Sequence, residues 1–514
     1  MTNGFKLLLD ELKKINSFVT IFLILIALAI PLFGVFSLYD PNIQIEINDY
    51  ILSITYFTIF QSLLSALFAL IVGSIFAYFL KENNELSLVR LIINLLSILF
   101  VLPTIIIVLG MLNIFNSFTN IYGPVGIIIC HVILNIPLVA RIIYQSIEDI
   151  SGNEYLLAKQ MGLKRFGTFL ATEWPVIKKN LPSLFVLIFF ICFVSFTPVL
   201  LLGGSPKFST IEVSIYQSVV FLNDYNVAFN LLMLQILICS IVFFLTFRSF
   251  KSNSFIIDER KTSSKYEKKI GIRFIDYLII VLISLLLFIS PITIFIKGIN
   301  LKFIEVINSD YFLTSLIDTL FICIGSGILS LIFTINILRI LEKSKRTYEY
   351  FFYIFLVLSP GIISIGYYVV INNYLQISIP SIMIVIIINS LFALPFTYNY
   401  LSASYFRVSK EHHDIASSMN IYGVTRIILF DWPRLKTPIT NAFCISSILS
   451  ASDLVIISFF GTNDLSTLTQ TIYRLMGSYR MDEAYSLTMI LFIFCFIYFS
   501  FFRIILVRKD GLFN

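Results

Sequence analysis

Three ionisable residues lie within long apolar runs of this sequence: Asp453, Asp318 and His131. An ionisable group at membrane depth is costly, so it marks a functional site by default. A carboxylate there can offset the charge of a cation that passes through the protein, or it can hydrogen-bond a neighbouring helix. Both interpretations of Asp453 and Asp318 stay open. For His131 a packing role is the favoured interpretation.

The other residues that carry chemistry do not form a recognisable catalytic site. The sequence has no phosphate-binding GxxxxGK[ST] loop, so the chain itself is not expected to hydrolyse ATP. It has no His/Cys/Asp cluster at metal-ligand spacing and no nucleophile elbow. The cysteines all fall in apolar segments and are interpreted as small buried hydrophobic residues: Cys130, Cys192, Cys239, Cys323, Cys444 and Cys495. We therefore expect no enzymatic activity and no metal or cofactor bound by this chain.

The composition is that of an integral membrane protein. Of 514 residues, 58% are hydrophobic and 13% are charged, and the mean hydropathy is +0.93. A soluble domain carries about 25% charged residues, and a membrane-spanning helix needs about 20 apolar ones. The sequence therefore predicts an all-α integral membrane fold with about twelve transmembrane helices. They are expected near residues 20–38, 54–80, 91–113, 124–146, 183–202, 227–247, 274–297, 313–340, 350–371, 380–402, 441–460 and 485–507.

Charge placement predicts the orientation in the membrane. Basic residues are concentrated in the N-terminal tail, in the segment 248–273 and at the C-terminal end. By contrast, the loop 39–50 contains Asp40, Glu46 and Asp49 and no Lys or Arg. The positive-inside rule then places both termini and the segment 248–273 in the cytoplasm. A charged connector is favoured over a nucleic-acid-binding segment at 248–273, so no nucleic-acid partner is expected.

Two polar loops of one design lie half a chain apart. The stretch "AKQMGLKRFGTFLATEWP" begins at Ala158, and "ASSMNIYGVTRIILFDWP" begins at Ala416, which is 258 residues later (416 minus 158). Gly203 and Gly461 repeat at the same offset. The sequence therefore predicts two six-helix repeats, residues 1–247 and 274–514, joined by a basic cytoplasmic linker, 248–273. An even number of helices per repeat makes the two repeats parallel, as in many transporters.

Each loop is expected to form a helix, a turn and a second helix at the cytoplasmic surface. In the first loop, Glu154, Leu157 and Ala158 are spaced for one face of a short helix. Gly162 then provides a turn with positive φ, for which Asn420 is the substitute in the second loop. Trp174-Pro175 is expected to end the second helix, because Pro disfavours helical backbone before it. The small Ala is expected at a contact with a partner, although an ordinary interfacial loop remains the alternative.

These loops resemble the EAA motif of permeases from binding-protein-dependent ABC importers. The motif corresponds to Leu156-Leu157-Ala158 with Gly162, and to Asp414-Ile415-Ala416 with Asn420. The resemblance implies a type I importer-like fold and two copies of a separate ATP-binding cassette subunit, which would hold ATP and magnesium. The residues expected to couple to that ATPase are Glu154, Leu157, Ala158, Gly162, Asp414, Ile415, Ala416 and Asn420.

Among fused permeases, the sequence resembles the thiamine type. The similar stretches are "EWPVIKKNLP", "CFVSFTPVLLLGGSPKFSTIEVSIYQSV" and "SDLVIISFFGTNDLSTLTQTIYRLMGSYR". The resemblance implies uptake of thiamine or its phosphate esters across the bacterial inner membrane. A periplasmic binding protein would deliver the substrate to the loops 203–226 and 461–482, and membrane lipid would surround the helices. A fused ferric-iron permease is the alternative, and an ion-coupled secondary transporter is a more distant one.

Thiamine carries a permanent positive charge, so a carboxylate on its path could offset that charge. Asp453 is expected within the eleventh helix, where the 258-residue offset gives Ser195 in the first repeat (453 minus 258). The charge is therefore not part of the duplicated scaffold. Asp453, and with it Asp318, is accordingly predicted to lie on or beside the substrate path.

Overall fold

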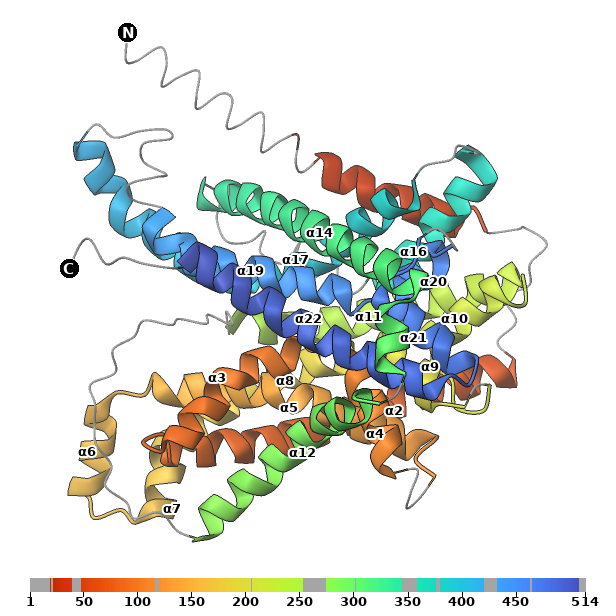
Figure 1. Cartoon of the computed structure of the whole chain (residues 1–514). Coiled ribbons are helices and arrows are strands. Elements are labelled where there is room, and N and C mark those ends of the chain that lie inside the picture. The colour runs from red at the N-terminus through yellow and green to blue at the C-terminus, as the bar shows by residue number, and fades with distance from the viewer. Residues whose placement is uncertain are drawn as a thin grey trace. The chain divides into compact units, whose positions relative to one another are not determined.

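The computed structural model describes residues 19, 22–38, 48–115, 120–204, 206–252, 274–300, 302–343, 358–375, 380–419, 432–462 and 465–507. Every regular element in these ranges is a helix. The prediction of an all-α fold is thereby confirmed (Figure 1).

The helices of the first half follow the predicted apolar segments, with several breaks. A helix at Phe22–Phe36 comes first. It is followed by α2 (Asp49–Glu82), α3 (Ser87–Val101), α4 (Thr104–Phe115), α5 (Pro124–Glu148), α6 (Gly152–Gln160), α7 (Arg165–Thr168), the π-helix η1 (Phe169–Glu173), α8 (Trp174–Phe193), α9 (Thr197–Leu202), α10 (Ile211–Val220) and α11 (Tyr225–Ser252).

The second half contains a similar series of helices in the described ranges. Its helices are α12 (Phe274–Gly298), α13 (Phe303–Ile307), α14 (Asp310–Lys343), α16 (Pro360–Val370), the π-helix η3 (Ile371–Leu375), α17 (Ser381–Ser418), α19 (Trp432–Ala451), α20 (Val455–Phe460), α21 (Leu468–Gly477) and α22 (Met481–Val507). Each half thus has a 20-residue helix that starts at Trp, α8 or α19, and a six-residue helix after it, α9 or α20.

Eight of the described helices are long and apolar enough to cross a membrane: Asp49–Glu82, Pro124–Glu148, Arg165–Phe193, Tyr225–Thr246, Phe274–Gly298, Asp310–Leu341, Ser381–Val408 and Met481–Ile505. The sequence predicted about twelve. The third and eleventh predicted segments are interrupted by helix breaks, and those near 20–38 and 350–371 lie partly outside the described residues. The third predicted helix is divided into α3 and α4 at Leu102-Pro103, because Pro lacks an amide hydrogen and restricts the residue before it. The fifth and the eleventh are each divided in two near their ends.

The long helices expose many large apolar side chains. Leu282 and Leu285 on α12 are each 57% exposed, and Phe321 on α14 is 63% exposed. Soluble proteins rarely expose apolar surface on this scale, whereas a helix in lipid satisfies its backbone internally and can present apolar side chains outward. The chain is therefore a multi-pass membrane protein.

The helices form two compact units, and each unit includes the first helix of the other half of the chain. One, here called the N-half unit, comprises Ile47–Ser214 and Leu237–Ile299, so it includes α12. The other, the C-half unit, comprises Met1–Glu46, Ile215–Ile236 and Asn300–Asn514, so it includes the helix Phe22–Phe36. The repeat boundaries predicted from the sequence describe the duplication, and they stay a prediction.

In the N-half unit, α2 packs against α5 and α8, and α4 packs against α12. The α4–α12 contact is very close at Gly110, where an added Cβ would lie 2.6 Å from the Cα atom of Ser290. In the C-half unit, α14, α17 and α19 pack against one another. There the helix Phe22–Phe36 crosses α16 at Gly34 and Gly366. A Cβ added to Gly34 would overlap the backbone of Gly366, and one added to Gly366 would overlap the backbone of Pro31.

These two close approaches occupy equivalent positions in the two halves. Ser290 follows Gly34 by 256 residues (290 minus 34), and Gly366 follows Gly110 by the same number (366 minus 110). In the C-half unit a further contact joins the same two helices, because the Tyr367 hydroxyl donates to the Ala27 carbonyl at 2.8 Å. The same crossing of a first helix over a third segment is therefore built twice, which agrees with a duplicated unit.

Candidate functional site

The first repeated loop (residues 152–175) has the predicted helix–turn–helix form. Its helix α6 ends at Gln160, and Gly162 in the turn that follows has a φ of +70°. The Leu163 amide donates to the Ala158 carbonyl at 3.1 Å. No atom lies within 4 Å of a Cβ added at Gly162, so only its backbone conformation demands glycine. The predicted positive-φ turn is thereby confirmed. Figure 1 shows α6 and α7 at one end of the α2–α5 bundle.

The second helix of this loop does not end at Trp174-Pro175, contrary to the prediction. Four residues of α7 lead into the π-helix η1, and α8 then begins at Trp174 with Pro175 in its first turn. Proline is tolerated in the first turn of a helix because its missing amide hydrogen would be unpaired there anyway. The loop and the membrane helix after it consequently form one nearly continuous helical rod, from Arg165 to Phe193.

The exposed surface of the loop includes several large apolar side chains, and the predicted contact residue Ala158 is not on it. Ala158 is 3% exposed and faces inward, so its small size serves packing within the protein. By contrast, Leu157 is 58% exposed, Met161 76% and Phe166 71%. Glu154, in the first turn of α6, is also exposed. A partner would therefore meet a large apolar surface in place of a bare backbone.

Buried polar contacts hold the loop to the N-half unit. Arg165 Nη2 lies 2.9 Å from Asp276 Oδ2 at the start of α12, and Arg165 Nε lies 3.3 Å from Glu82 Oε2 at the end of α2. The Tyr155 hydroxyl of α6 donates to Glu173 Oε1 at 3.1 Å. Burial, together with the Glu173 carboxylate, raises the pKa of Tyr155 above its ordinary value. These contacts thus hold the loop in place, while its apolar side chains remain exposed.

In the second half, the corresponding residues lie at the end of the 38-residue helix α17. Asp414, Ile415 and Ala416 are in its last two turns, and their side chains lie outside the described residues. Asn420 lies outside the described residues as well. The prediction for the second loop therefore stays a prediction.

Asp453 does not lie within a helix, as the sequence predicted, but in the gap between α19 and α20. Its Oδ1 atom accepts a hydrogen bond from the Val455 amide at 3.1 Å, and its Oδ2 atom accepts one from the Ile456 amide at 3.1 Å. Asp side chains favour this position because they satisfy amides that lack a partner at a helix start. The side chain is only partly buried.

Asn389 on α17 is a neighbour of Asp453 that the sequence analysis missed. It is 3% exposed and lies within interaction range of the Asp453 carboxyl group. Its side chain hydrogen-bonds that carboxyl group and so joins α17 to the segment before α20. The offset of 258 residues, applied to His131, gives Asn389 (131 plus 258) and would have pointed to it.

The first half has the equivalent gap between α8 and α9, with Ser195 in it. The Ser195 hydroxyl lies 2.8 Å from His131 Nε2 on α5. His131 is 2% exposed, so it is a buried residue hydrogen-bonded between two helices, which fits the favoured packing role. The two halves thus have different polar pairs at equivalent positions.

Asp318 on α14 is partly buried and has a different partner from Asp453. Its Oδ2 atom accepts a hydrogen bond from the Ser466 amide at 3.1 Å. The hydroxyl oxygen of the next residue, Thr319, accepts a hydrogen bond from the Leu468 amide at 2.9 Å. Asp318 thus ties α14 to the start of α21. In the described ranges, no residue bridges the two carboxylates.

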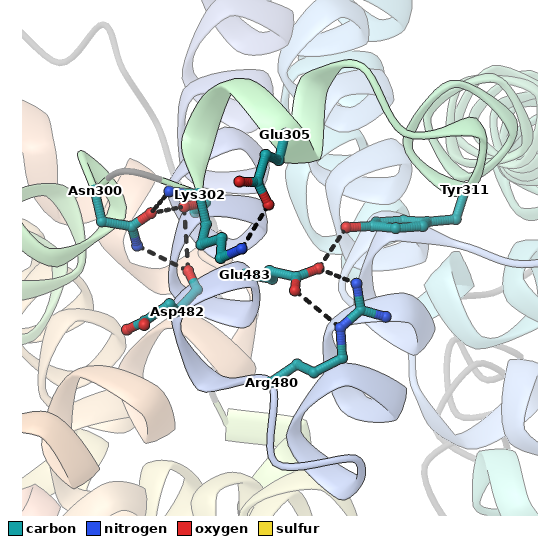
Figure 2. A network of polar contacts seen from close by, with 8 residues as sticks. Asn300, Lys302, Glu305, Tyr311, Arg480, Asp482 and Glu483 are labelled. Carbon is teal, nitrogen blue, oxygen red and sulfur yellow. Dashed lines mark hydrogen bonds and ion pairs between the residues drawn. The ribbon is translucent and has the colours of Figure 1, made fainter.

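A polar network surrounds the Gly477-Ser478-Tyr479-Arg480 stretch that resembles the thiamine type. Figure 2 shows Arg480 and Tyr311 meeting the same carboxylate, that of Glu483. Arg480 Nε lies 2.9 Å from Glu483 Oε1, and the Tyr311 hydroxyl donates to Glu483 Oε2 at 2.9 Å. Nearby, Asn300 Nδ2 donates to the Asp482 carbonyl at 2.9 Å. The network joins α14 to the start of α22.

Tyr479 stands at the tip of this turn, held in an unfavourable conformation. Its φ is +60°, its side chain is 93% exposed, and its amide donates to the Met476 carbonyl at 3.1 Å. A positive φ is uncommon for a residue other than glycine, and such strain persists where the surroundings enforce it, often at functional sites. In the first half, the turn after α10 has the same feature at Asn223, with φ of +52°.

Comparison with known proteins gives relatives along nearly the whole chain. The thiamine transport system permease protein ThiP of Haemophilus influenzae is 29% identical over 483 residues, which is 88% of both chains. The protein of the same name from Escherichia coli is 26% identical over 496 residues, 90% of both chains. That of Brucella abortus is 26% identical over 469 residues, 87% of this chain and 86% of the relative.

No family model matches the chain, and no solved structure matches it. The curated relatives are named as permeases of thiamine transport systems, and they are matched across both halves and the segment between them. The all-helical membrane fold agrees with a permease subunit that does no enzymatic chemistry of its own. Along nearly its whole length, this chain resembles the fused permease of thiamine transport systems.

Proposed function

We propose that this chain is the permease subunit of an ATP-driven ABC importer that carries thiamine, or its phosphate esters, across the bacterial inner membrane. The observation that carries this proposal is the similarity to permeases of thiamine transport systems over 87–90% of the chain. A shared domain would match only part of the chain, whereas this similarity covers most of it.

The proposed partner at the cytoplasmic side is an ATP-binding cassette subunit, present in two copies that hold ATP and magnesium. The support within the chain is the exposed apolar surface of the first repeated loop, formed by Leu157, Met161 and Phe166. Exposed apolar patches with a polar rim mark protein interaction sites. The second copy would bind at the end of α17. Both loops and both termini then lie in the cytoplasm, in agreement with the positive-inside rule.

The proposed partner at the opposite side is a periplasmic substrate-binding protein. It would contact the outer loops 203–226 and 461–482, where Tyr479 is exposed on a turn with positive φ. Closure of the two ATPase subunits on ATP would move the cytoplasmic loops, and the helical rod from Arg165 to Phe193 would carry that movement into the membrane. Each partner shifts the equilibrium between two conformations of the permease only to the extent that it binds one conformation more tightly than the other.

The decisive experiment is transport by the complete complex in proteoliposomes. The permease, the ATPase and the binding protein are reconstituted together, and uptake and ATP hydrolysis are measured with thiamine, thiamine pyrophosphate and ferric ion in separate reactions. We expect thiamine or its ester to stimulate both uptake and hydrolysis. Stimulation by ferric ion alone would show that the substrate is ferric ion and not thiamine. Uptake without ATP would show that the protein is a secondary transporter and not an ATP-driven importer.

A further inference from the structure

One largely buried arginine connects the first repeated loop to two membrane helices. Arg165 is the first residue of α7, and its side chain is 16% exposed. Its Nη2 atom lies 2.9 Å from Asp276 Oδ2 and its Nη1 atom donates to Asp276 Oδ1 at 3.2 Å, so the guanidinium group meets the carboxylate of α12 as a fork. Its Nε atom lies 3.3 Å from Glu82 Oε2 at the end of α2. Arg165, Glu82 and Asp276 are here called the loop clamp.

Aromatic contacts add to the attachment between the loop and α2. Arg165 Nε donates to the Tyr78 hydroxyl at 3.1 Å, and the guanidinium carbon lies 5.6 Å from the centroid of the Tyr78 ring. That distance is within the range of cation–π attraction. The ring of Phe169 in η1 meets the Tyr78 ring edge-on, with centroids 5.0 Å apart. The loop is thus attached to α2 through α7 and through η1.

The loop clamp also connects the first loop to the first helix of the second predicted repeat. Asp276 is near the start of α12, which packs against α4 at the close approach of Gly110 and Ser290. Separating Arg165 from Asp276 would leave buried charges without their partners, which is unfavourable. A movement of α7 is therefore expected to carry α12 with it. Figure 1 shows α7 and the start of α12 at the same end of the bundle.

The equivalent helices α2 and α14 end in opposite charges. Both are 34 residues long. Thr58 of α2 accepts a hydrogen bond from the first amide of α10, and Thr319 of α14 accepts one from the first amide of α21, so the two helices are related by 261 residues (319 minus 58). The same offset gives Lys343 at the position of Glu82 (82 plus 261). A cation therefore replaces one carboxylate of the loop clamp.

The other two members of the loop clamp are also missing from the second half. The 258-residue offset of the loops gives Gly423 for Arg165 (165 plus 258). The 256-residue offset of the first helices gives Thr20 for Asp276 (276 minus 256). The sequence pattern of the loop thus recurs without the charges of the loop clamp. The loop clamp is therefore a feature of the first loop and not of the duplicated design.

We propose that Arg165 is a positioning residue for transport: it makes the first loop, the end of α2 and the start of α12 move as one body when the ATPase moves the loop. The inference rests on the proposed function, since it needs an ATPase bound to the loop. Movement of the ATPase then reaches the first helix of the second repeat through the first loop. The two ATPase subunits are consequently connected to the membrane helices by unequal contacts.

The test removes all charges of the loop clamp together, so that coupling is separated from stability. The neutral triple variant, Arg165→Met with Glu82→Gln and Asp276→Asn, leaves no charge of the loop clamp unpaired. Arg165→Lys is the conservative variant, because it keeps a cation beside both carboxylates and loses the fork. Lys81→Met is the matched control, since Lys81 Nζ lies 3.6 Å from Glu148 Oε1 and joins the same end of α2 to α5.

Each permease is reconstituted with the ATPase and the binding protein in proteoliposomes. The measurements are co-purification of the ATPase, ATP hydrolysis with and without thiamine-loaded binding protein, and thiamine taken up per ATP hydrolysed. We expect the neutral triple variant to bind the ATPase and to lose stimulation by the binding protein about five-fold or more, a typical size for coupling between two sites. Uptake per ATP should fall with it. Arg165→Lys should give an intermediate value, and Lys81→Met should match wild type.

Three results would overturn the inference while the proposed function stands. The first is wild-type stimulation in the neutral triple variant or, if that variant does not fold, in Arg165→Lys. The second is a folded triple variant that no longer binds the ATPase, because Arg165 would then act in docking alone. The third is an equal loss in Lys81→Met, which would show a general effect of disturbed packing. If the wild-type complex itself shows no thiamine-dependent hydrolysis or uptake, the proposed function fails instead.

Discussion

Arg165 and Asp276, 111 residues apart in the chain, form an ion pair of 2.9 Å between Arg165 Nη2 and Asp276 Oδ2. Arg165 begins the second helix of the first repeated loop, and Asp276 is near the start of α12. The exposed fractions of the two side chains are 16% and 7%. The loop proposed to receive the ATPase is therefore fastened to the first helix of the second half.

Arg165→Met is expected to destabilise the folded protein, because it leaves Glu82 and Asp276 as buried carboxylates without their cation. Breaking a buried ion pair costs about 3–5 kcal/mol, and the partial exposure of Arg165 reduces this to about 2 kcal/mol. Thermal unfolding of the detergent-solubilised permease measures the effect. Asp276→Asn in the Arg165→Met background should recover part of the loss. An unchanged unfolding temperature in Arg165→Met would show that the ion pair contributes nothing to stability.

Met161→Asp and Phe166→Asp should each prevent stable binding of the ATPase without unfolding the permease. Both side chains are more than two-thirds exposed, so a charge there costs the isolated protein little but would be buried in the interface. Co-purification of the ATPase measures the result. Leu222→Asp, at a 69% exposed position of the outer loop 203–226, is the matched control and should leave ATPase binding intact. Normal co-purification of both loop variants would contradict the docking surface.

Ala158→Arg should behave differently from those variants. Because Ala158 is 3% exposed, a long charged side chain cannot be accommodated without displacing α6. We expect faster proteolysis of the loop in the permease alone, before any ATPase is added. Limited proteolysis with and without the ATPase separates this effect from a lost contact. A proteolysis rate equal to wild type would mean that Ala158 tolerates a large residue.

Gly162→Val should weaken ATPase binding more than Gly162→Asn does. The φ of +70° is strained for a β-branched residue by about 1–3 kcal/mol, whereas Asn adopts this conformation more readily. Space is not the cause, because nothing lies within 4 Å of the added Cβ. ATPase affinity, measured by titration on immobilised permease, should rank wild type first, then Asn, then Val. Equal affinities for Asn and Val would exclude a role for the backbone conformation.

Tyr479→Gly and Tyr479→Ala together separate the aromatic ring from the backbone. Glycine keeps the turn and removes the ring, whereas alanine removes the ring and retains most of the strain at φ of +60°. If the ring contacts the binding protein, both variants should lose stimulation of ATP hydrolysis by that protein to a similar extent. Arg480→Met, which releases Glu483, should lose part of it. Full stimulation in both Tyr479 variants would show that the ring does not contribute to the interface.

Local and compositional features of this protein were predictable from the sequence. The membrane fold follows from composition, and the turn at Gly162 follows from a single residue whose conformational range is special. The break at Asp453 was missed, because no proline marks it and a six-residue helix follows within the same apolar run. The Arg165–Asp276 ion pair was not predictable either, since it depends on how α12 packs against a distant part of the chain.

Asn389 is an intermediate case. Nothing in its own surroundings in the sequence distinguishes it from a helix-packing amide. Its hydrogen bond to Asp453 becomes visible only in the structure, and the duplication identifies His131 as its counterpart. The inward position of Ala158 is similar, because a small residue before a turn has the same sequence pattern whether it faces a partner or the protein interior.

The crossing of Gly34 over Gly366 has a consequence for how the protein is made. The neighbouring contact from Tyr367 to Ala27 spans 340 residues, and a ribosome that adds roughly 5–20 residues per second needs about 20–70 seconds to synthesise them. During that interval the helix Phe22–Phe36 lacks its contacts with α16. The packing of Gly34 against Gly366 can therefore form only after α16 has been synthesised.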